Sequence, residues 1–114
     1  MIIVDTTNTE HYKWGEGCDG WRFVNSDSLS VIREKMLPKT QEQLHYHKKA
    51  QQFFYVISGT ATFEIDNELI EVVRDKGLWI KPGMKHKISN QTDADLEFLV
   101  ISQPKSHGDR INLE

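Results

Sequence analysis

The segment that decides the fold is His45-Tyr46-His47-Lys48-Lys49-Ala50-Gln51-Gln52. Two histidines one residue apart point the same way only on a β-strand, because strand side chains alternate between faces whereas helical ones turn by about 100° per residue. Imidazole is the commonest protein ligand for transition metals, so His45 and His47 supply half of a coordination shell. A third histidine, His86, would complete the shell if the chain returns to the same place. The pattern predicts a metal site inside a β-barrel.

The rest of the chain is patterned for short strands, because β-branched and aromatic residues cluster between turn residues such as Ser58-Gly59 and Pro82-Gly83. The first 17 residues and the tail from Pro104 are less patterned, and we expect a surface loop at Pro104–Arg110, with Ile111 and Leu113 docking onto the barrel. Many short strands at this spacing predict an all-β sandwich or barrel. We expect strands at Trp21–Asn25, Leu29–Leu37, Gln43–His47, Gln52–Ser58, Thr60–Ile65, Glu68–Val73, Leu78–Lys81, His86–Ser89 and Asp95–Ser102.

Strand alternation also predicts what surrounds the histidines. If His45 and His47 point inward, every second residue on the neighbouring strands points inward with them. A few polar groups in an apolar barrel are typical of a small-molecule pocket. The expected pocket wall is Phe54, Val56, Ile88, Phe98 and Val100.

Composition limits the class of protein. The chain has 114 residues, which we interpret as a single domain over residues 1–114. Its net charge is -3 with acids and bases interspersed, which argues against nucleic-acid or anionic-membrane binding. Apolar runs such as Phe53–Ile57 are too short to span a bilayer, and no signal peptide is evident at the start. The single cysteine, Cys18, fits a reducing compartment, so we expect a cytoplasmic protein.

These residues resemble the cupin superfamily, whose two motifs are G-x5-H-x-H-x3-4-E-x6-G and G-x5-P-x-G-x2-H-x3-N. The motif core covers residues 45–90, in the order His45, His47, Gln52, Gly59, Gly77, Pro82, Gly83, His86 and Asn90. The resemblance implies a double-stranded β-helix, or jelly-roll barrel, often dimeric, with a metal ion in the barrel mouth. Known cupins include dioxygenases, isomerases, decarboxylases, cyclases and non-catalytic binders, so the fold alone does not give the function.

The sequence departs from the motifs at three places. The first glycine of the first motif is missing, and Pro38 and Lys39 occupy that loop. The proline of the second motif is shifted by one, since Pro82 directly precedes Gly83. The glutamate position holds Gln52, six residues before Gly59.

The exchange of glutamate for Gln52 changes the chemistry expected of the metal. A neutral amide oxygen is a weaker donor than a carboxylate and leaves the ion its full charge, which favours acidic bound water and anionic substrates. Gln52 cannot serve as a general base. We therefore expect His45, His47, His86 and Gln52 to bind a divalent zinc, nickel, iron or manganese ion in a Lewis-acid role. The alternatives are a vestigial site, or a Gln52 amide that never touches metal.

Two functions follow as alternatives. The first is a metal-dependent enzyme of isomerase, cyclase or dioxygenase type, acting on a small anionic or carbonyl-containing metabolite. The second is a non-catalytic module that binds a small molecule or a sugar. The catalytic residues, the substrate and the native metal are not indicated by the sequence. Outward apolar residues, together with the Ile2-Ile3-Val4 segment, predict a homodimer. They are Tyr55, Ile57, Leu99 and Ile101.

Overall fold

The computed structural model describes all residues, 1–114, and consists of β-strands and turns. No helix is present that is long and apolar enough to cross a membrane. The strands are β1 (Glu10–Trp14), β2 (Cys18–Asn25), β3 (Ser30–Met36), β4 (Thr40–Gln41), β5 (His45–His47), β6 (Gln51–Ser58), β7 (Thr60–Ile65), β8 (Glu68–Val73), β9 (Gly77–Ile80), β10 (His86–Asn90), β11 (Leu96–Gln103) and β12 (Arg110–Asn112).

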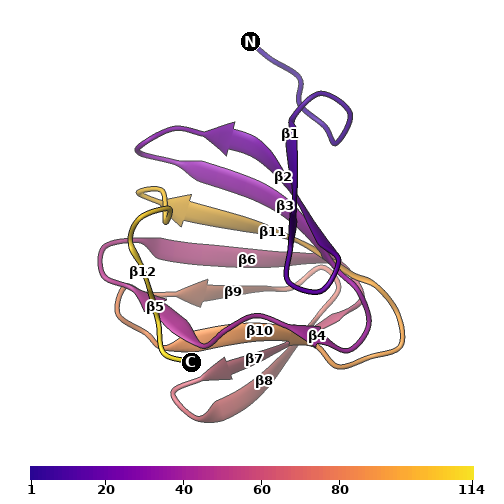
Figure 1. Cartoon of the computed structure of the whole chain (residues 1–114), viewed down its shortest axis with the longest axis vertical. Helices are drawn as coiled ribbons and strands as arrows, with labels where there is room; N and C mark the ends of the chain where they lie inside the picture. Colours follow the sequence, from indigo (N-terminus) through magenta and orange to yellow (C-terminus); the bar gives the residue numbers. More distant parts are fainter.

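Two antiparallel sheets face each other (Figure 1). The first has the order β1-β2-β3-β11-β6-β9, and the second has the order β12-β5-β10-β7-β8, with β4 also paired to β10. Neighbours such as β6 and β11 are far apart in sequence, so the chain passes repeatedly from one sheet to the other. This is the jelly-roll arrangement of a double-stranded β-helix, and it confirms the predicted all-β class.

The core lies between the sheets. Thirteen buried apolar residues form one cluster, built from every second residue of the long strands. On β11, for example, Leu96, Phe98 and Val100 are buried. The Phe54 ring lies 5.1 Å from that of Phe63 across the sandwich and 5.8 Å from that of Phe98 beside it. Such packing of aromatic rings fixes the spacing of the sheets.

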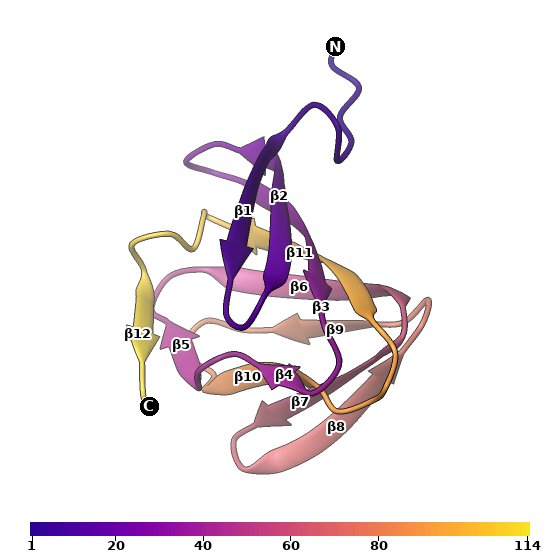
Figure 2. The ribbon, with the colours of Figure 1, turned by 45° about the vertical axis from the view of Figure 1, so that its right-hand side comes forward.

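Two strands lie where no strand was expected. Strand β1 pairs with β2 in a hairpin at one end of the first sheet, and β12 pairs with β5 (Figure 2). No strand was predicted at Glu10–Trp14, and the surface loop predicted for Pro104–Arg110 ends where β12 begins, at Arg110. Only Tyr12 and Trp14 of β1 are partly buried, and β12 has a single apolar residue, Ile111. Segments this polar or short carry too little hydrophobic alternation to be recognised.

The missing motif glycines are replaced without a change of backbone conformation. Counted back from the histidines, the motif spacings place these glycines at positions 39 and 75, where the chain has Lys39 with φ of 62° and Asp75 with φ of 67°. Both residues adopt the left-handed conformation that favours glycine. Assigning the second motif's first glycine to Gly77 was therefore wrong by two residues. Gly77 is needed for a different reason, since a Cβ there would lie 2.4 Å from the Phe53 ring.

This backbone predicts that Lys39→Gly stabilises the protein. A residue with a Cβ in the left-handed conformation destabilises the folded state by about 1–2 kcal/mol. Glycine removes this strain, but it loses more chain entropy on folding, which offsets about 0.5–1 kcal/mol of the gain. We expect the free energy of unfolding to rise by about 0.5–1 kcal/mol in urea titrations. Lys39→Ala is the control, because it removes the exposed Nζ–Gln91 hydrogen bond but keeps the Cβ. A glycine variant no more stable than the alanine variant would contradict the explanation.

Candidate metal centre

Three histidines meet inside the barrel. His45 and His47 lie on β5, and His86 lies opposite His45 on the paired strand β10. One ring nitrogen of each lies within 4.8 Å of the others. The exposed fractions are 2%, 4% and 1%, so none of the rings is solvated by bulk water. The predicted convergence of the three histidines is confirmed, and the cluster could hold a metal ion.

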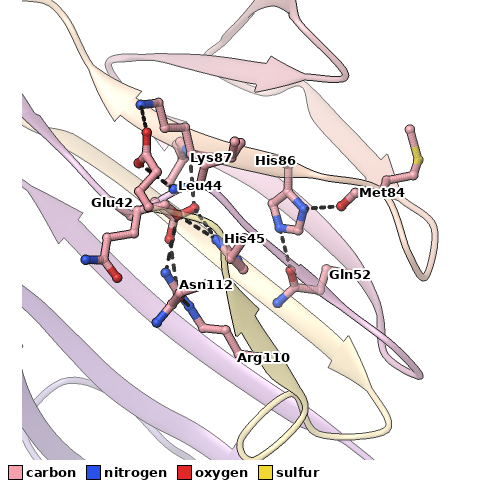
Figure 3. A network of polar contacts seen from close by, with 12 residues as sticks. Glu42, Leu44, His45, Gln52, Met84, His86, Lys87, Arg110 and Asn112 are labelled. Carbon is pink, nitrogen blue, oxygen red and sulfur yellow. Dashed lines mark hydrogen bonds and ion pairs between the residues drawn. The ribbon is translucent and has the colours of Figure 1, made fainter.

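Backbone carbonyls orient two of the rings. The Nδ1 atom of His45 lies 2.8 Å from the Gln43 oxygen, and that of His86 lies 2.8 Å from the Met84 oxygen (Figure 3). A carbonyl oxygen only accepts, so each Nδ1 must carry the proton and donate it. A neutral ring then has a lone pair on Nε2. This tautomer is the one that metal-binding histidines commonly adopt.

No hydrogen-bond donor reaches the acceptor atoms that remain in the cluster. Neither ring nitrogen of His47 has a hydrogen-bond partner, although the side chain is buried. The Nε2 atom of His86 lies 3.2 Å from Oε1 of Gln52, and the Gln52 amide nitrogen donates to Ser102 at 3.0 Å. With the His86 proton on Nδ1, two acceptors face each other. Unsatisfied buried groups are costly, and a cation bound by His86 Nε2, Gln52 Oε1 and the unprotonated nitrogen of His47 would satisfy these three acceptors, so the residues fit a metal ion.

Burial keeps the histidines uncharged. Loss of solvation, followed by the repulsion of neighbouring charges, lowers the pKa of His45 to about 3 and that of His47 to about 4. The pKa of His86 is lowered as well, again chiefly by burial. Neutral imidazole is the form that ligates metals, so the cluster is ready for binding at neutral pH.

A cavity of about 280 Å³ opens onto the cluster. His45, His47 and Gln52 line it, together with Phe54 and Val100 of the expected wall. The other three expected wall residues belong to the buried core and are not among the residues that line the cavity; they are Val56, Ile88 and Phe98. Strand alternation predicts which side chains point inward, but not how deep along the barrel each one lies. This explains why only two of the five expected wall residues line the cavity.

The sequence analysis missed four further polar residues that line this cavity. Tyr12, Arg22, Glu34 and Glu42 all line it. Glu34 could have been found, because Ser30, Glu34 and Met36 share one face of β3, and Ser30 and Met36 are buried. Tyr12 could not, because β1 was not recognised as a strand.

Glu34 is an unusual carboxyl group. Burial, and then the charge of Glu42, raise its pKa to about 8. Its only side-chain hydrogen bond comes from the Tyr12 hydroxyl, at 3.4 Å. Glu34 is therefore a group that holds a proton near neutral pH and faces the same cavity as the histidines.

Glu42 ties the histidine cluster to the C-terminal strand. It accepts a hydrogen bond from the Ile88 amide at 3.0 Å, and burial raises its pKa to about 7. Its Oε1 lies 3.9 Å from Nδ1 of His45, and its Oε2 lies 3.7 Å from Nη1 of Arg110 (Figure 3). A carboxylate behind a ligand histidine is a frequent outer partner of metal sites.

The C-terminal segment also fixes the turn between the second histidine and Gln52. The Asp109 carboxylate accepts backbone hydrogen bonds from Lys48, Lys49 and Ala50, at 2.9 to 3.2 Å. Burial acts to raise the pKa of Asp109, but these three bonds outweigh it and hold the pKa below its usual value. Strand β12 then pairs Arg110 with His47. The cavity mouth is completed by Lys105, Ser106, His107 and Gly108.

The fold and the histidine cluster agree with the family that the sequence matches. Residues 32–102 match the model of the cupin domain, and the chain belongs to this family. That span contains the three histidines and Gln52 but excludes Tyr12, Arg22 and the segment from Gln103 onward.

Similar proteins carry varied names. An uncharacterised protein of Methanocaldococcus jannaschii is 35% identical over 72 residues, which are 62% of this chain and 58% of that protein. The polyketide synthase CurC of Streptomyces cyaneus is 29% identical over 69 residues, 60% of this chain and 45% of that protein. The chain thus spans about half the length of these curated relatives. A sugar phosphate isomerase structure from Silicibacter pomeroyi matches with a TM-score of 0.81 at 20% identity, over 91% of this chain and 76% of that one. This likeness shows the fold alone.

The buried histidines predict acid lability of the metal-free protein. The pKa of His47 is about 4 when folded and 6.5 in the reference state, so the unfolded chain binds more protons between these values. Stability is complete above the unfolded pKa and is lost as the pH falls through this window. Between about pH 7 and pH 5, we expect wild type to lose about 1–2 kcal/mol more unfolding free energy than His47→Gln. Both proteins are titrated with urea in the presence of a chelator.

The comparison isolates His47, because the other buried histidines and the Glu34 and Glu42 carboxyls are common to both proteins. Equal losses in the two proteins would mean that His47 is protonated as easily in the folded state as in the unfolded one.

Proposed function

We propose that the protein is a metal-binding cupin enzyme that acts on a small anionic or carbonyl-containing metabolite. His45, His47 and His86 would hold a divalent zinc, nickel, iron or manganese ion, with Gln52 as the fourth ligand. The observation that carries the proposal is a buried set of acceptor atoms that no donor reaches: Nε2 of His86, Oε1 of Gln52 and the unprotonated ring nitrogen of His47, whose two ring nitrogens both lack a hydrogen-bond partner.

Hydrogen bonds within the protein orient three of the four proposed ligands, His45, His86 and Gln52. The carbonyls of Gln43 and Met84 fix the tautomers of two histidines, and Ser102 holds the Gln52 amide so that its oxygen faces His86. Preorganised ligands lose little freedom on binding. The donor set of three imidazoles and one amide is neutral and suits a borderline transition metal better than calcium or magnesium.

The bound ion would supply Lewis acidity, polarising an oxygen atom of the substrate. The protein's own residues would do the rest. Arg22, Lys105 and Arg110 at the cavity attract an anion. Phe54 and Val100 contact its apolar part and reduce the water around it.

The alternative is a non-catalytic binding module. The sequence keeps this alternative open because it shows no evident inward acid or base besides the histidine site. The position of Glu34, a carboxyl group with a raised pKa in the same cavity, supports the enzyme over the binder. Names among the relatives and structural matches, such as polyketide synthase and sugar phosphate isomerase, are compatible with an enzyme.

Three broader assignments stay proposals. We propose that residues 1–114 act as one cupin domain, that the protein is cytoplasmic, as the lone buried thiol of Cys18 suggests, and that it forms a homodimer.

The metal proposal is tested by elemental analysis of protein purified without a polyhistidine tag. We expect about one transition-metal ion per chain. His47→Ala should weaken affinity by more than 100-fold in competition with a fluorescent chelator, since loss of a direct ligand exceeds the ~10–100-fold effect of outer partners. Gln52→Glu should bind more tightly, because it restores a carboxylate. Unchanged affinity in that variant would mean that Gln52 does not ligate.

His11→Ala is the matched control, because His11 is a partly exposed histidine that pairs with Asp19 far from the cluster. It should keep its metal. Absence of metal from wild type, even after reconstitution with each of the four ions, would refute the proposed centre.

The homodimer is proposed from an apolar row on the outer face of the first sheet. Ile101, Phe53 and Trp79 are neighbours across β11, β6 and β9, and Phe53 and Trp79 are 39% and 59% exposed. We expect a dimer at micromolar concentration in sedimentation experiments, converted to monomer by Trp79→Glu. Leu69→Glu, on β8 of the other sheet, should remain dimeric. A monomeric wild type would disprove the assignment.

A further inference from the structure

A row of residues crosses three strands beside the cavity. Tyr12 on β1 lies opposite Gly20 on β2, and Gly20 lies opposite Glu34 on β3. Tyr12 and Glu34 are therefore two strands apart, about 10 Å by ordinary strand spacing, yet their side-chain oxygens are 3.4 Å apart. The two side chains meet above the strand between them.

Gly20 permits this contact. A Cβ at position 20 would lie 2.3 Å from Cζ and 2.6 Å from the hydroxyl oxygen of Tyr12. The tyrosine ring thus lies directly over the glycine, and any side chain there would displace it. The ring is held from its other side by the Arg22 guanidinium, whose carbon lies 4.5 Å from the ring centroid. Glycine, tyrosine and arginine together place the hydroxyl group at Glu34.

The pair has no evident structural purpose. Glu34 forms no ion pair, and its carboxyl group lines the cavity that also contains His45, His47 and Gln52. Burying a carboxyl group whose sole side-chain partner is a long hydrogen bond lowers stability. Such costly groups cluster at functional sites, where they hold or transfer protons.

We propose that Glu34 is the proton-transfer residue of the site and that Tyr12 is its positioning residue. This rests on the proposed metal-dependent function. The substrate class is a small carbonyl compound that also bears a carboxylate or phosphate group. Its carbonyl oxygen lies toward the histidines and an adjacent C–H bond lies toward Glu34.

The step conserves atoms and electrons. The ionised Glu34 carboxylate takes a proton from the substrate carbon, and the electron pair of the C–H bond moves into a carbon–carbon double bond as charge develops on the carbonyl oxygen. The carboxyl group then returns the proton to the same carbon, or, where that carbon bears a hydroxyl group whose proton passes to the former carbonyl oxygen, to the former carbonyl carbon. The outcome is hydrogen exchange in the first case and isomerisation in the second, with no net oxidation. No other reactant is required.

The anionic group of the substrate is inferred from the cations of the cavity. Arg22 pairs with Glu10 and Lys105 pairs with Asp27, and these carboxylates are 68% and 100% exposed. Exposed pairs are weak because water and salt screen them. A ligand carboxylate or phosphate can therefore replace either partner at little cost.

The experiment uses zinc-loaded protein and three probes: pyruvate, 2-oxoglutarate and dihydroxyacetone phosphate. Binding is measured by calorimetry, and exchange of the C–H beside the carbonyl is followed by proton NMR in deuterated water. We expect wild type to exchange at least one probe, and Glu34→Gln to be slower by at least about 100-fold. Its metal content and its affinity for the probe should stay within about threefold of wild type. Glu71→Gln, an exposed glutamate on β8, is the control and should match wild type.

Tyr12→Phe tests the positioning role. The hydroxyl group stabilises the ionised carboxyl and lowers the pKa of Glu34, so its removal raises that pKa. The pH at which exchange reaches half of its maximum should therefore rise. Gly20→Ala should have the same effect. In metal-free protein, both variants should shift the carboxyl carbon NMR signal of Glu34. If Gly20→Ala does not fold, the result for Tyr12→Phe tests the positioning role by itself.

Failure of the two proposals would look different. Lack of bound zinc in wild type refutes the metal centre before any probe is added. With zinc bound, three outcomes overturn the Glu34 proposal: no binding of any probe, binding without exchange, or exchange that survives Glu34→Gln. An unshifted Glu34 signal in Tyr12→Phe overturns the role of the tyrosine.

Discussion

The pairing of β5 with β10 is the constraint on which the site depends. It sets His45 opposite His86, with His47 at the next inward position of the same strand. Strand β5 has only three residues, so its position is set by its neighbours. Strand β10 holds one edge and β12 the other. The Asp109 carboxylate fixes the turn that follows His47. The ligand geometry is thus a property of the second sheet as a whole.

The cavity combines groups of opposite character. At one side, burial depresses the histidine pKa values and leaves neutral nitrogen donors. At the other side, the same loss of solvation raises the pKa of Glu34 and leaves a protonated acid. Both effects follow from removing charged forms from water. A single environment therefore yields a cluster of neutral histidines and a carboxyl group that holds its proton near neutral pH.

The features that could be predicted from the sequence are those set by residues close together in the chain. The histidine spacing, the long alternating strands and the turn residues between them are local, and they indicated the fold and the cluster. Tyr12 could not be placed because β1 has few apolar residues and is held by pairing with β2. Glu34 lies within a strand that was predicted, but its burial depends on side chains from other strands, such as Tyr12 of β1, and these were not predicted to lie there. The depth of Val56 and Phe98 likewise depends on packing between sheets that alternation does not encode.

The β1–β2 hairpin has an evolutionary consequence. It supplies Tyr12, Gly20 and Arg22, yet it lies outside the residues that match the family model, as does the C-terminal segment with Lys105. The strands that carry the histidine cluster match the family model, whereas the hairpin and the tail, which supply part of the cavity lining, lie outside it. Descendants of one barrel can acquire new substrates by replacing a hairpin or a tail while the histidines stay untouched. Kinship judged on the central strands alone leaves the cavity-lining residues of the hairpin and the tail uncompared.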